Sequence, residues 1–222
     1  MTVALIIPAY DAAPTISRLL EDAGMFFGAG HILVVDDGST DDTAAIARQS
    51  GAVVLGHVVN RGKGAALRTG FRWALDNGYD AVLTMDADGQ HACHEIPLFL
   101  EAAESFDSDI ILGSRMADPS GMPWHRHFSN RLTSRILSWR TGQKIHDSQS
   151  GFRLIKTKVL ADIALETNRF QAESELLIKT GLCGYRIGSV PITSIYTGHH
   201  SAIRPFTDTC RFVVLIGRSL GW

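Results

Sequence analysis

The stretch AVLTMDADGQH (residues 81–91) changes from an apolar run to two carboxylates. Its first half has the composition of a buried strand, and Asp86 and Asp88 follow where that strand is expected to end. Positions i and i+2 of an extended chain share a face, so the two carboxylates are expected side by side. Gly89 permits a sharp turn, after which Gln90 can return its amide oxygen to the same point. We predict that Asp86, Asp88 and Gln90 hold Mg²⁺ or Mn²⁺ shared with a phosphate group; the alternative is an ordinary polar turn.

Around this stretch, apolar strand-like runs alternate with helical patterns. Strands are expected at 3–8, 31–36, 52–56, 81–85 and 109–112, and helices at 13–27, from 39 or 40 to 49, 63–77 and 95–104. This alternation predicts an α/β fold, with a mostly parallel, Rossmann-like sheet flanked by helices. The second half is less regular, with helices expected at 129–139, 173–180 and 207–220 and a strand at 151–155.

Four of the expected strands are followed by polar residues, at 10–11, 36–39, 86–88 and 113–115. Parallel sheets bind ligands beyond the carboxyl ends of their strands, so we expect these four segments to converge on one crevice. One carboxylate of the pair Asp36 and Asp37 is also expected to cap the helix that follows.

Composition narrows the class of protein. The 222 residues are 45% hydrophobic and 20% charged, which is typical of a single globular domain spanning 1–222. A net charge of −2 gives no reason to expect a nucleic-acid partner. The three cysteines form no disulfide framework, and neither a signal peptide nor a membrane-spanning apolar run is evident. We therefore expect a cytoplasmic protein.

The chain resembles family 2 glycosyltransferases in six stretches that occur in order: IPAY (7–10), VVDDGSTD (34–41), NRGKG (60–64), DADGQH (86–91), GSR (113–115) and DSQSGFR (147–153). Within that family it is most similar to dolichol-phosphate mannose synthases and bacterial polyprenyl-phosphate relatives. The resemblance implies a GT-A fold and a metal-dependent, inverting transfer of a hexose, mannose or glucose, from a GDP- or UDP-linked sugar to a polyprenyl or dolichyl phosphate.

The resemblance also implies a role for each residue that occupies a motif position. The donor nucleotide and its phosphates would be bound by Pro8, Tyr10, Val35, Asp37, Asp86, Ala87, Asp88 and Arg115. The acceptor side would be formed by Arg131, Ser134, Gln149 and Arg153. The predicted catalytic residues are Asp88, Asp147 and Arg115.

The chemistry of the acceptor decides whether a catalytic base is required. A phosphate monoester is already anionic at neutral pH and can attack the sugar directly once aligned. A hydroxyl of a lipid or polysaccharide would need a base, for which Asp147, Glu173 and Glu175 are candidates. A sugar-phosphate nucleotidyltransferase is a further alternative, but residues 8–11 (PAYD) lack the glycine-rich basic loop expected of that class.

The C-terminal segment 205–222 has an apolar helical pattern with arginines and a terminal Trp222. Such a helix either packs on the core or lies in a membrane interface, with its arginines at the headgroup level. The second alternative predicts peripheral contact with the cytoplasmic face of the membrane, where a polyprenyl acceptor resides.

Overall fold

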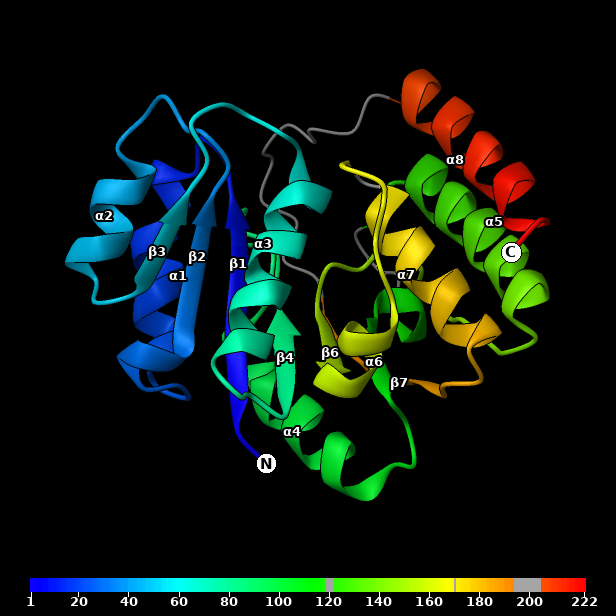
Figure 1. The fold of residues 1–222 in the computed structure, drawn as a ribbon, viewed down its shortest axis with the longest axis horizontal. Helices are drawn as coiled ribbons and strands as arrows, with labels where there is room; N and C mark the ends of the chain where they lie inside the picture. The colour runs from blue at the N-terminus through cyan, green and yellow to red at the C-terminus, as the bar shows by residue number, and fades with distance from the viewer. Residues whose placement is uncertain (119–121, 170, 194–204) are drawn as a thin grey trace.

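A computed structural model describes residues 1–118, 122–169, 171–193 and 205–222. Within these ranges the strands form one seven-stranded sheet in the order β3-β2-β1-β4-β6-β5-β7 (Figure 1). Their bounds are β1 Val3–Ala9, β2 Ile32–Asp36, β3 Val53–Gly56, β4 Ala81–Thr84, β5 Ile110–Ser114, β6 Arg153–Lys156 and β7 Ile187–Pro191. Strand β6 runs antiparallel to its neighbours β4 and β5, whereas the other pairings are parallel.

Helices cover both faces of the sheet. One face is covered by α1 (Ala13–Gly24), α2 (Thr43–Gln49) and α4 (Ile96–Ser105). The other is covered by α3 (Lys63–Asp76), α6 (Thr157–Asp162) and α7 (Gln171–Leu182). Two further helices, α5 (Trp124–Thr141) and α8 (Pro205–Ser219), pack against α7. Short 3₁₀ turns occupy Ala29–His31, Cys93–Glu95 and Arg115–Ala117.

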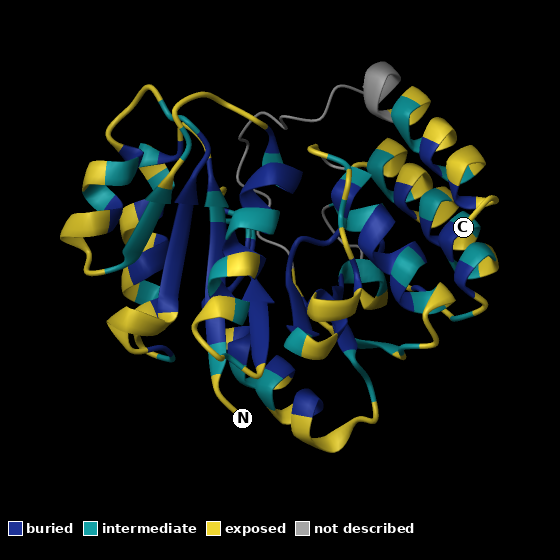
Figure 2. Cartoon of the chain, viewed as in Figure 1, coloured by how far each residue is buried: buried dark blue, intermediate teal, exposed yellow. Residues whose placement is uncertain are grey.

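The apolar pattern of the strands explains this layering. In β1, Leu5 and Ile7 lie in one core cluster and Ile6 lies in the other, and all three are fully buried. Central strands buried on both faces need apolar residues at successive positions. Figure 2 shows the central strands in the colour of buried residues. The structure confirms the predicted α/β class with a mostly parallel sheet.

Three local expectations were wrong or incomplete. The helix expected from 39 or 40 begins at Thr43, and neither Asp36 nor Asp37 caps it. Instead, Asp41 accepts hydrogen bonds from the backbone N–H groups of Thr43 and Ala13, 3.0 Å each, at the starts of α2 and α1. The antiparallel direction of β6 was not predicted, because the sequence of a short apolar strand does not indicate its direction. The short helix α6 was not predicted either.

Helix α8 places its apolar side on the rest of the molecule. Leu215 is buried, and Phe212 and Ile216 pack against the core cluster beneath α3 and α7. Val213 and Val214 remain exposed. Of the helices in the described ranges, none combines the length and apolarity needed to cross a membrane.

A buried carboxylate, Glu175 on α7, fixes the loop that precedes this helix. It accepts hydrogen bonds from the backbone N–H groups of Glu166 and Thr167, each 2.9 Å, and forms an ion pair with Lys179 at 2.7 Å. Burial alone would raise the pKa of Glu175, but the Lys179 contact and the hydrogen bonds hold it below its ordinary value.

The loop fixed by Glu175 packs on the first turn of α3. The carbonyl of Asn168 accepts a hydrogen bond from the backbone N–H of Ala65 at 3.2 Å. A Cβ atom added to Gly64 would lie 2.7 Å from the carbonyl oxygen of Thr167, so only glycine fits there. Glu175 therefore supports the position of the chain around residue 63, which matters for the site described below.

We predict that Glu175→Gln lowers the free energy of unfolding by about 2–3 kcal/mol at neutral pH, because it removes a buried charge that has a full set of partners. The pKa of Glu175 is lower in the folded than in the unfolded chain, so its contribution is present above the unfolded value and is lost as the pH falls towards the folded one. Urea titrations at neutral pH and at about pH 3 should show this difference shrinking in acid.

Glu166→Gln is the matched control, because Glu166 is an exposed partner of the same Lys179 at 3.3 Å. We expect a loss of about 0.5 kcal/mol or less for it. Equal losses in the two variants would contradict the role given to Glu175.

Candidate functional site

The candidate site lies at the edge of the sheet where β1, β2 and β4 end. Strand β1 has β2 on one side and β4 on the other, so the order of the parallel strands reverses beside it. Ligands of open α/β sheets bind at such a reversal, beyond the carboxyl ends of the strands. The segment after β4 meets α1 there, since the hydroxyl of Thr15 on α1 donates to the carbonyl of Ala87 at 2.5 Å. The segment at 113–115 follows β5, which β6 separates from β4.

Asp11 joins the ends of β1 and β2. Its backbone N–H donates to the Ser39 hydroxyl at 2.9 Å, and its carboxylate accepts from the backbone N–H of Thr40 at 2.8 Å. Asp11 has a φ of +48°, a left-handed conformation that aspartate tolerates better than most residues. Ser39 in turn donates its hydroxyl to Asp36. The two segments thus form one hydrogen-bonded unit.

Asp37 holds the loop that leads into α3. One carboxylate oxygen accepts from the backbone N–H of Arg61 at 3.0 Å and contacts Nδ1 of His57 at 2.6 Å; the other accepts from the N–H of Gly62 at 2.6 Å. Nε2 of His57 lies 2.9 Å from the Thr69 hydroxyl. A direct contact between Asp37 and a nucleobase stays a prediction, whereas its hold on the 61–62 backbone is observed.

Asp86, the first carboxylate after β4, is paired with a lysine. Nζ of Lys63 lies 2.6 Å from Asp86 and 3.2 Å from Glu173, and Nε2 of His91 lies 3.8 Å from Asp86. Burial alone would raise the pKa of Asp86, but Lys63 and His91 hold it far below its ordinary value. Burial would lower the pKa of Lys63, but Asp86 and Glu173 raise it. Both members of the pair are therefore charged.

Glycine is required beside this pair. A Cβ atom added to Gly151 would lie 2.4 Å from Oδ2 of Asp86, so the chain at 151 packs directly on the carboxylate. Asp88 is exposed and accepts a hydrogen bond from the backbone N–H of Gln90 at 3.0 Å. Gln90 is half-buried and Ala87 is buried.

A second polar cluster follows β5. Asp147 is fully buried. Its carboxylate accepts hydrogen bonds from Nε and Nη2 of Arg115 at 2.8 and 2.9 Å, which form a bidentate ion pair. Nδ2 of Asn130 donates to the same carboxylate at 2.6 Å. Burial would raise the pKa of Asp147, but Arg115 and Asn130 hold it below its ordinary value. This ion pair connects the end of β5 to the loop before β6.

Helix α5 and the loop before β6 carry three of the residues predicted for the acceptor side. Ser134 is buried and hydrogen-bonded to Ser148, with 2.9 Å between its hydroxyl and the Ser148 backbone N–H. Gln149 is exposed, and its amide lies 3.3 Å from the Thr133 hydroxyl. Arg131 is exposed on α5. Of these residues, Arg131 and Gln149 are accessible to an acceptor, whereas Ser134 supports the loop beneath them.

Arg153, also predicted to contact the acceptor, is only 1% exposed. Its guanidinium donates to the carbonyls of Ser150, Ser148 and Glu173 at 2.7, 2.8 and 3.0 Å. Arg153 therefore fixes the 148–151 loop to α7, and the acceptor role implied for it stays a prediction.

The other residues predicted to contact the nucleotide differ in their exposure to solvent. Tyr10 is 48% exposed, and the neighbouring Asp11 carboxylate raises the pKa of its hydroxyl. Pro8 is half-buried at the end of β1. Val35 is fully buried and its side chain belongs to the core, and its predicted contact with the nucleotide stays a prediction.

The donor set suits a metal that is shared with a ligand. In the described part of the chain, no group of three or more histidine, cysteine, aspartate or glutamate side chains is placed to hold a metal. Asp86 and Asp88 provide two carboxylates at an accessible strand end. Mg²⁺ on nucleotides is held by one or two carboxylates together with phosphate oxygens and water. The residues present therefore fit such an ion.

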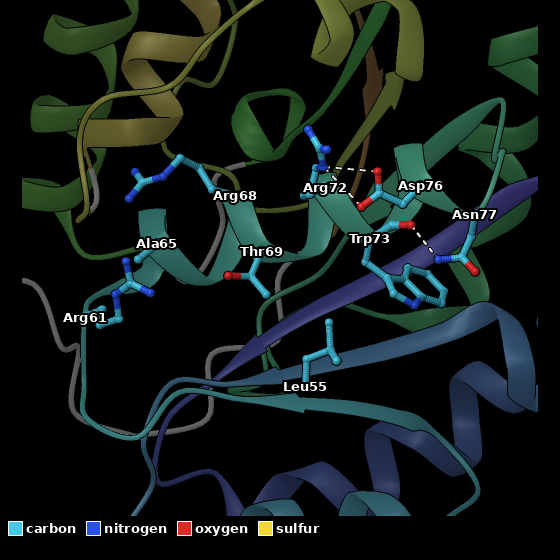
Figure 3. A pocket seen from close by; sticks show the side chains of 9 residues that line it. All are labelled: Leu55, Arg61, Ala65, Arg68, Thr69, Arg72, Trp73, Asp76 and Asn77. Carbon is cyan, nitrogen blue, oxygen red and sulfur yellow. Dashed lines mark hydrogen bonds and ion pairs between the residues drawn. The ribbon is translucent and has the colours of Figure 1, made fainter.

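A separate cavity of about 460 Å³ lies between β3 and the outer side of α3 (Figure 3). It is lined by Arg61, Arg68 and Arg72, together with Leu55, Trp73 and other side chains of α3. Neither Asp86 nor Asp88 lines it. The cavity is therefore distinct from the site at the strand ends.

Sequence reasoning did not find the partners of the site carboxylates. Lys63 stands in the NRGKG stretch, whose pattern did not connect it to Asp86. His57 gave no signal at all, because a lone histidine after a strand is common. Only the fold brings Lys63 to Asp86 and His57 to Asp37.

Comparison with known proteins gives a consistent picture. The model of glycosyl transferase family 2 matches residues 4–164. Polyprenol monophosphomannose synthase of Mycolicibacterium smegmatis is 32% identical over 85% of this chain and 76% of that protein. UDP-N-acetylglucosamine–dolichyl-phosphate N-acetylglucosaminyltransferase of Methanococcus voltae is 30% identical over 89% of this chain and 87% of that protein.

Among solved structures, glucosyl-3-phosphoglycerate synthase from Mycobacterium tuberculosis, crystallised with Mn²⁺, UDP-glucose and phosphoglyceric acid, has a TM-score of 0.74. The match covers 99% of this chain and 80% of that chain at 20% identity. This likeness concerns the fold, and it confirms the expected GT-A architecture.

We predict that Asp37→Asn weakens the attachment of the 61–62 backbone, because an amide cannot accept at both of its ends. Amide hydrogen exchange at Arg61 and Gly62 should accelerate by about tenfold or more, which corresponds to the loss of a charge-assisted hydrogen bond. The neighbouring Asp36→Asn serves as the control and should leave both amides protected. Unchanged exchange at Arg61 and Gly62 in Asp37→Asn would show that this carboxylate does not hold the loop.

Proposed function

Because this chain belongs to glycosyl transferase family 2, we propose that it moves a hexose, mannose or glucose, from a GDP- or UDP-linked sugar to a polyprenyl or dolichyl phosphate. Transfer proceeds with inversion at the anomeric carbon. The donor diphosphate lies at the ends of β1, β2 and β4, and the acceptor phosphate approaches from α5.

The choice of acceptor rests on one observation: each of the three carboxylates that could act as a base is paired with a cation. Asp147 is bound on two sides by Arg115, Glu173 is paired with Lys63, and Glu175 is paired with Lys179. The pKa values of Asp147 and Glu175 are held below their ordinary values. A carboxylate stabilised in this way is a weak proton acceptor.

A phosphate acceptor requires no such base. It is already anionic near neutral pH, and the protein needs only to align it with the sugar. The name of one relative above contains polyprenol monophosphomannose, and the name of the other contains dolichyl phosphate. These observations favour a polyprenyl phosphate over a lipid or polysaccharide hydroxyl.

On the donor side, the metal would be held by Asp86, Asp88 and Gln90. When bound, Mg²⁺ or Mn²⁺ would neutralise charge on the departing diphosphate as a Lewis acid. Lys63 keeps the Asp86 carboxylate in place, and Asp37 keeps the loop before Lys63 in place. Tyr10 and Pro8 offer the accessible surface of the β1 end for the base and ribose.

On the acceptor side, the exposed Arg131 would bind the acceptor phosphate, with Gln149 beside it. Asp147 acts through Arg115 in this proposal, because its two-pronged ion pair fixes the direction of the guanidinium. Asp147 is thus a positioning residue, and Arg115 is the residue expected to face phosphate. We also expect the protein to meet its acceptor at the cytoplasmic face of the membrane, and the contact of 205–222 with that surface stays a prediction.

The test is the release of nucleoside diphosphate from a panel of GDP- and UDP-linked mannose and glucose, with Mg²⁺ or Mn²⁺, in the presence and absence of a short-chain polyprenyl phosphate. We expect release from one donor that depends on both the metal and the lipid phosphate. Asp88→Ala should lower the rate by about a hundredfold or more, because charge on the leaving group is no longer offset.

Asp76→Ala is the matched control, since Asp76 is an exposed carboxylate at the end of α3 paired with Arg72 at 3.0 Å. It should keep the full rate. Donor turnover that ignores the lipid phosphate would move the acceptor to a hydroxyl, and release of pyrophosphate from a nucleoside triphosphate and a sugar phosphate would indicate a nucleotidyltransferase. Full activity with EDTA would contradict the metal site.

A further inference from the structure

The outer face of α5 exposes large apolar side chains along one side of the helix. Trp124, Phe128, Leu132 and Trp139 are 81, 64, 50 and 70% exposed. With 3.6 residues per turn, these four side chains lie within about a quarter of the helix circumference. We call this set the α5 stripe. Soluble helices normally expose polar residues on their outer face, so the α5 stripe requires an explanation.

The opposite face of α5 is buried. Asn130, Ser134, Leu137 and Thr141 point away from the stripe and pack towards α7 and the loop at 147–149. The helix therefore already has a partner on its inner side. The aromatic side chains of the stripe are not needed for that packing, and Figure 2 shows α5 at the periphery of the molecule with exposed residues along it.

Charge on α5 has a single sign. Residues 124–141 contain no aspartate or glutamate and include four arginines, Arg126, Arg131, Arg135 and Arg140. Arg131 and Arg135 are exposed and, at helical spacing, lie on the same side as the α5 stripe. A second copy of this chain docked by two-fold symmetry would bring these arginines towards each other. The charge instead complements an anionic surface.

We propose that the α5 stripe, with Arg131 and Arg135, docks on the surface of an anionic phospholipid bilayer. Trp124, Phe128 and Leu132 enter the interface, and the arginine guanidinium groups lie at the level of the lipid phosphates. Tryptophan and arginine are suited to this depth because each combines an apolar body with a polar end. The biological reason for such docking rests on the proposed function, in which the acceptor is a membrane lipid.

The inner face of α5 connects this surface to the site. Asn130 hydrogen-bonds Asp147 at 2.6 Å, and Asp147 holds Arg115. A bilayer on the outer face would thus lie about one helix diameter, roughly 10 Å, from the Arg115–Asp147 cluster. Docking through α5 places the proposed acceptor site at the depth where a polyprenyl phosphate displays its headgroup.

Vesicle cosedimentation without donor or acceptor tests the docking alone. The probes are vesicles of phosphatidylcholine and phosphatidylglycerol in equal parts and vesicles of pure phosphatidylcholine. We expect binding to the mixed vesicles, about tenfold weaker binding for the double variant Trp124→Ser/Phe128→Ser, and about fivefold weaker binding for Arg135→Glu. Met25→Ser, at another exposed apolar position, and Arg18→Glu are the matched controls and should bind as the wild type does.

A second comparison distinguishes α5 from α8. Val213→Ser/Val214→Ser should lower vesicle binding less than Trp124→Ser/Phe128→Ser does. The proposal is overturned if the wild type ignores anionic vesicles, if the α8 variant loses binding and the α5 variant does not, or if the wild type is a dimer that Trp124→Ser/Phe128→Ser converts to a monomer.

Activity separates this proposal from the proposed function. Trp124→Ser/Phe128→Ser should retain its rate on a short, water-soluble polyprenyl phosphate and lose it on a long-chain acceptor embedded in vesicles. Vesicle binding through α5 without any lipid-dependent transfer would leave the docking surface in place and refute the acceptor instead. Equal losses on the two acceptors would assign the α5 stripe to the integrity of the site and would overturn the docking.

Discussion

The ion pair between Lys63 and Asp86 is the interaction on which the site depends. At 2.6 Å it joins the first turn of α3 to the end of β4, and the 3.2 Å contact of Lys63 with Glu173 extends the connection to α7. Arg153 completes the cluster from β6, with one guanidinium nitrogen 3.7 Å from Glu173. Two cations and two anions thus balance in a cluster in which Arg153 is buried and the other three members are half-buried. Removal of one member would leave an uncompensated charge and weaken the cluster.

This balance explains why the surrounding chain is so constrained. Gly151 packs on Asp86, Gly64 packs under the loop held by Glu175, and Asp37 holds the backbone just before Lys63. Each of these contacts limits where the Lys63 ammonium can lie. The same arrangement means that Asp86 already has a positive partner in the free protein. A divalent cation held by Asp86 would therefore compete with Lys63, and a diphosphate bound with it would supply negative charge that relieves this competition.

The sequence predicted most strands and helices of the sheet, but it did not predict the ion pairs. Buried strands such as 3–9 and 32–36 were recognised because only a sheet covered on both faces tolerates such apolar runs. Asp86 and Asp88 were placed correctly at a strand end because they interrupt one of these runs. The burial of Arg153 was not predicted, since nothing in the sequence distinguishes a buried arginine from an exposed one.

Partners distant in the chain were the main omission. Arg115 and Asp147 are far apart in sequence, as are Asp37 and the 61–62 backbone, and no local pattern links them. These pairs form because β6 inserts between β4 and β5 and because α3 begins next to the end of β2. They also bear on the chemistry, since the candidate bases Asp147 and Glu175 are each paired with a cation.

The affinity of nucleoside diphosphate for the protein, measured by calorimetry with Mn²⁺ and with EDTA, tests the central claim most directly: that the carboxylates after β4 hold a metal shared with the donor diphosphate. We expect Mn²⁺ to strengthen the binding of GDP or UDP by about tenfold or more in the wild type. Asp86→Ala and Asp88→Ala should lose this gain. Equal affinity with Mn²⁺ and with EDTA, or the same gain in the variants, would contradict the account.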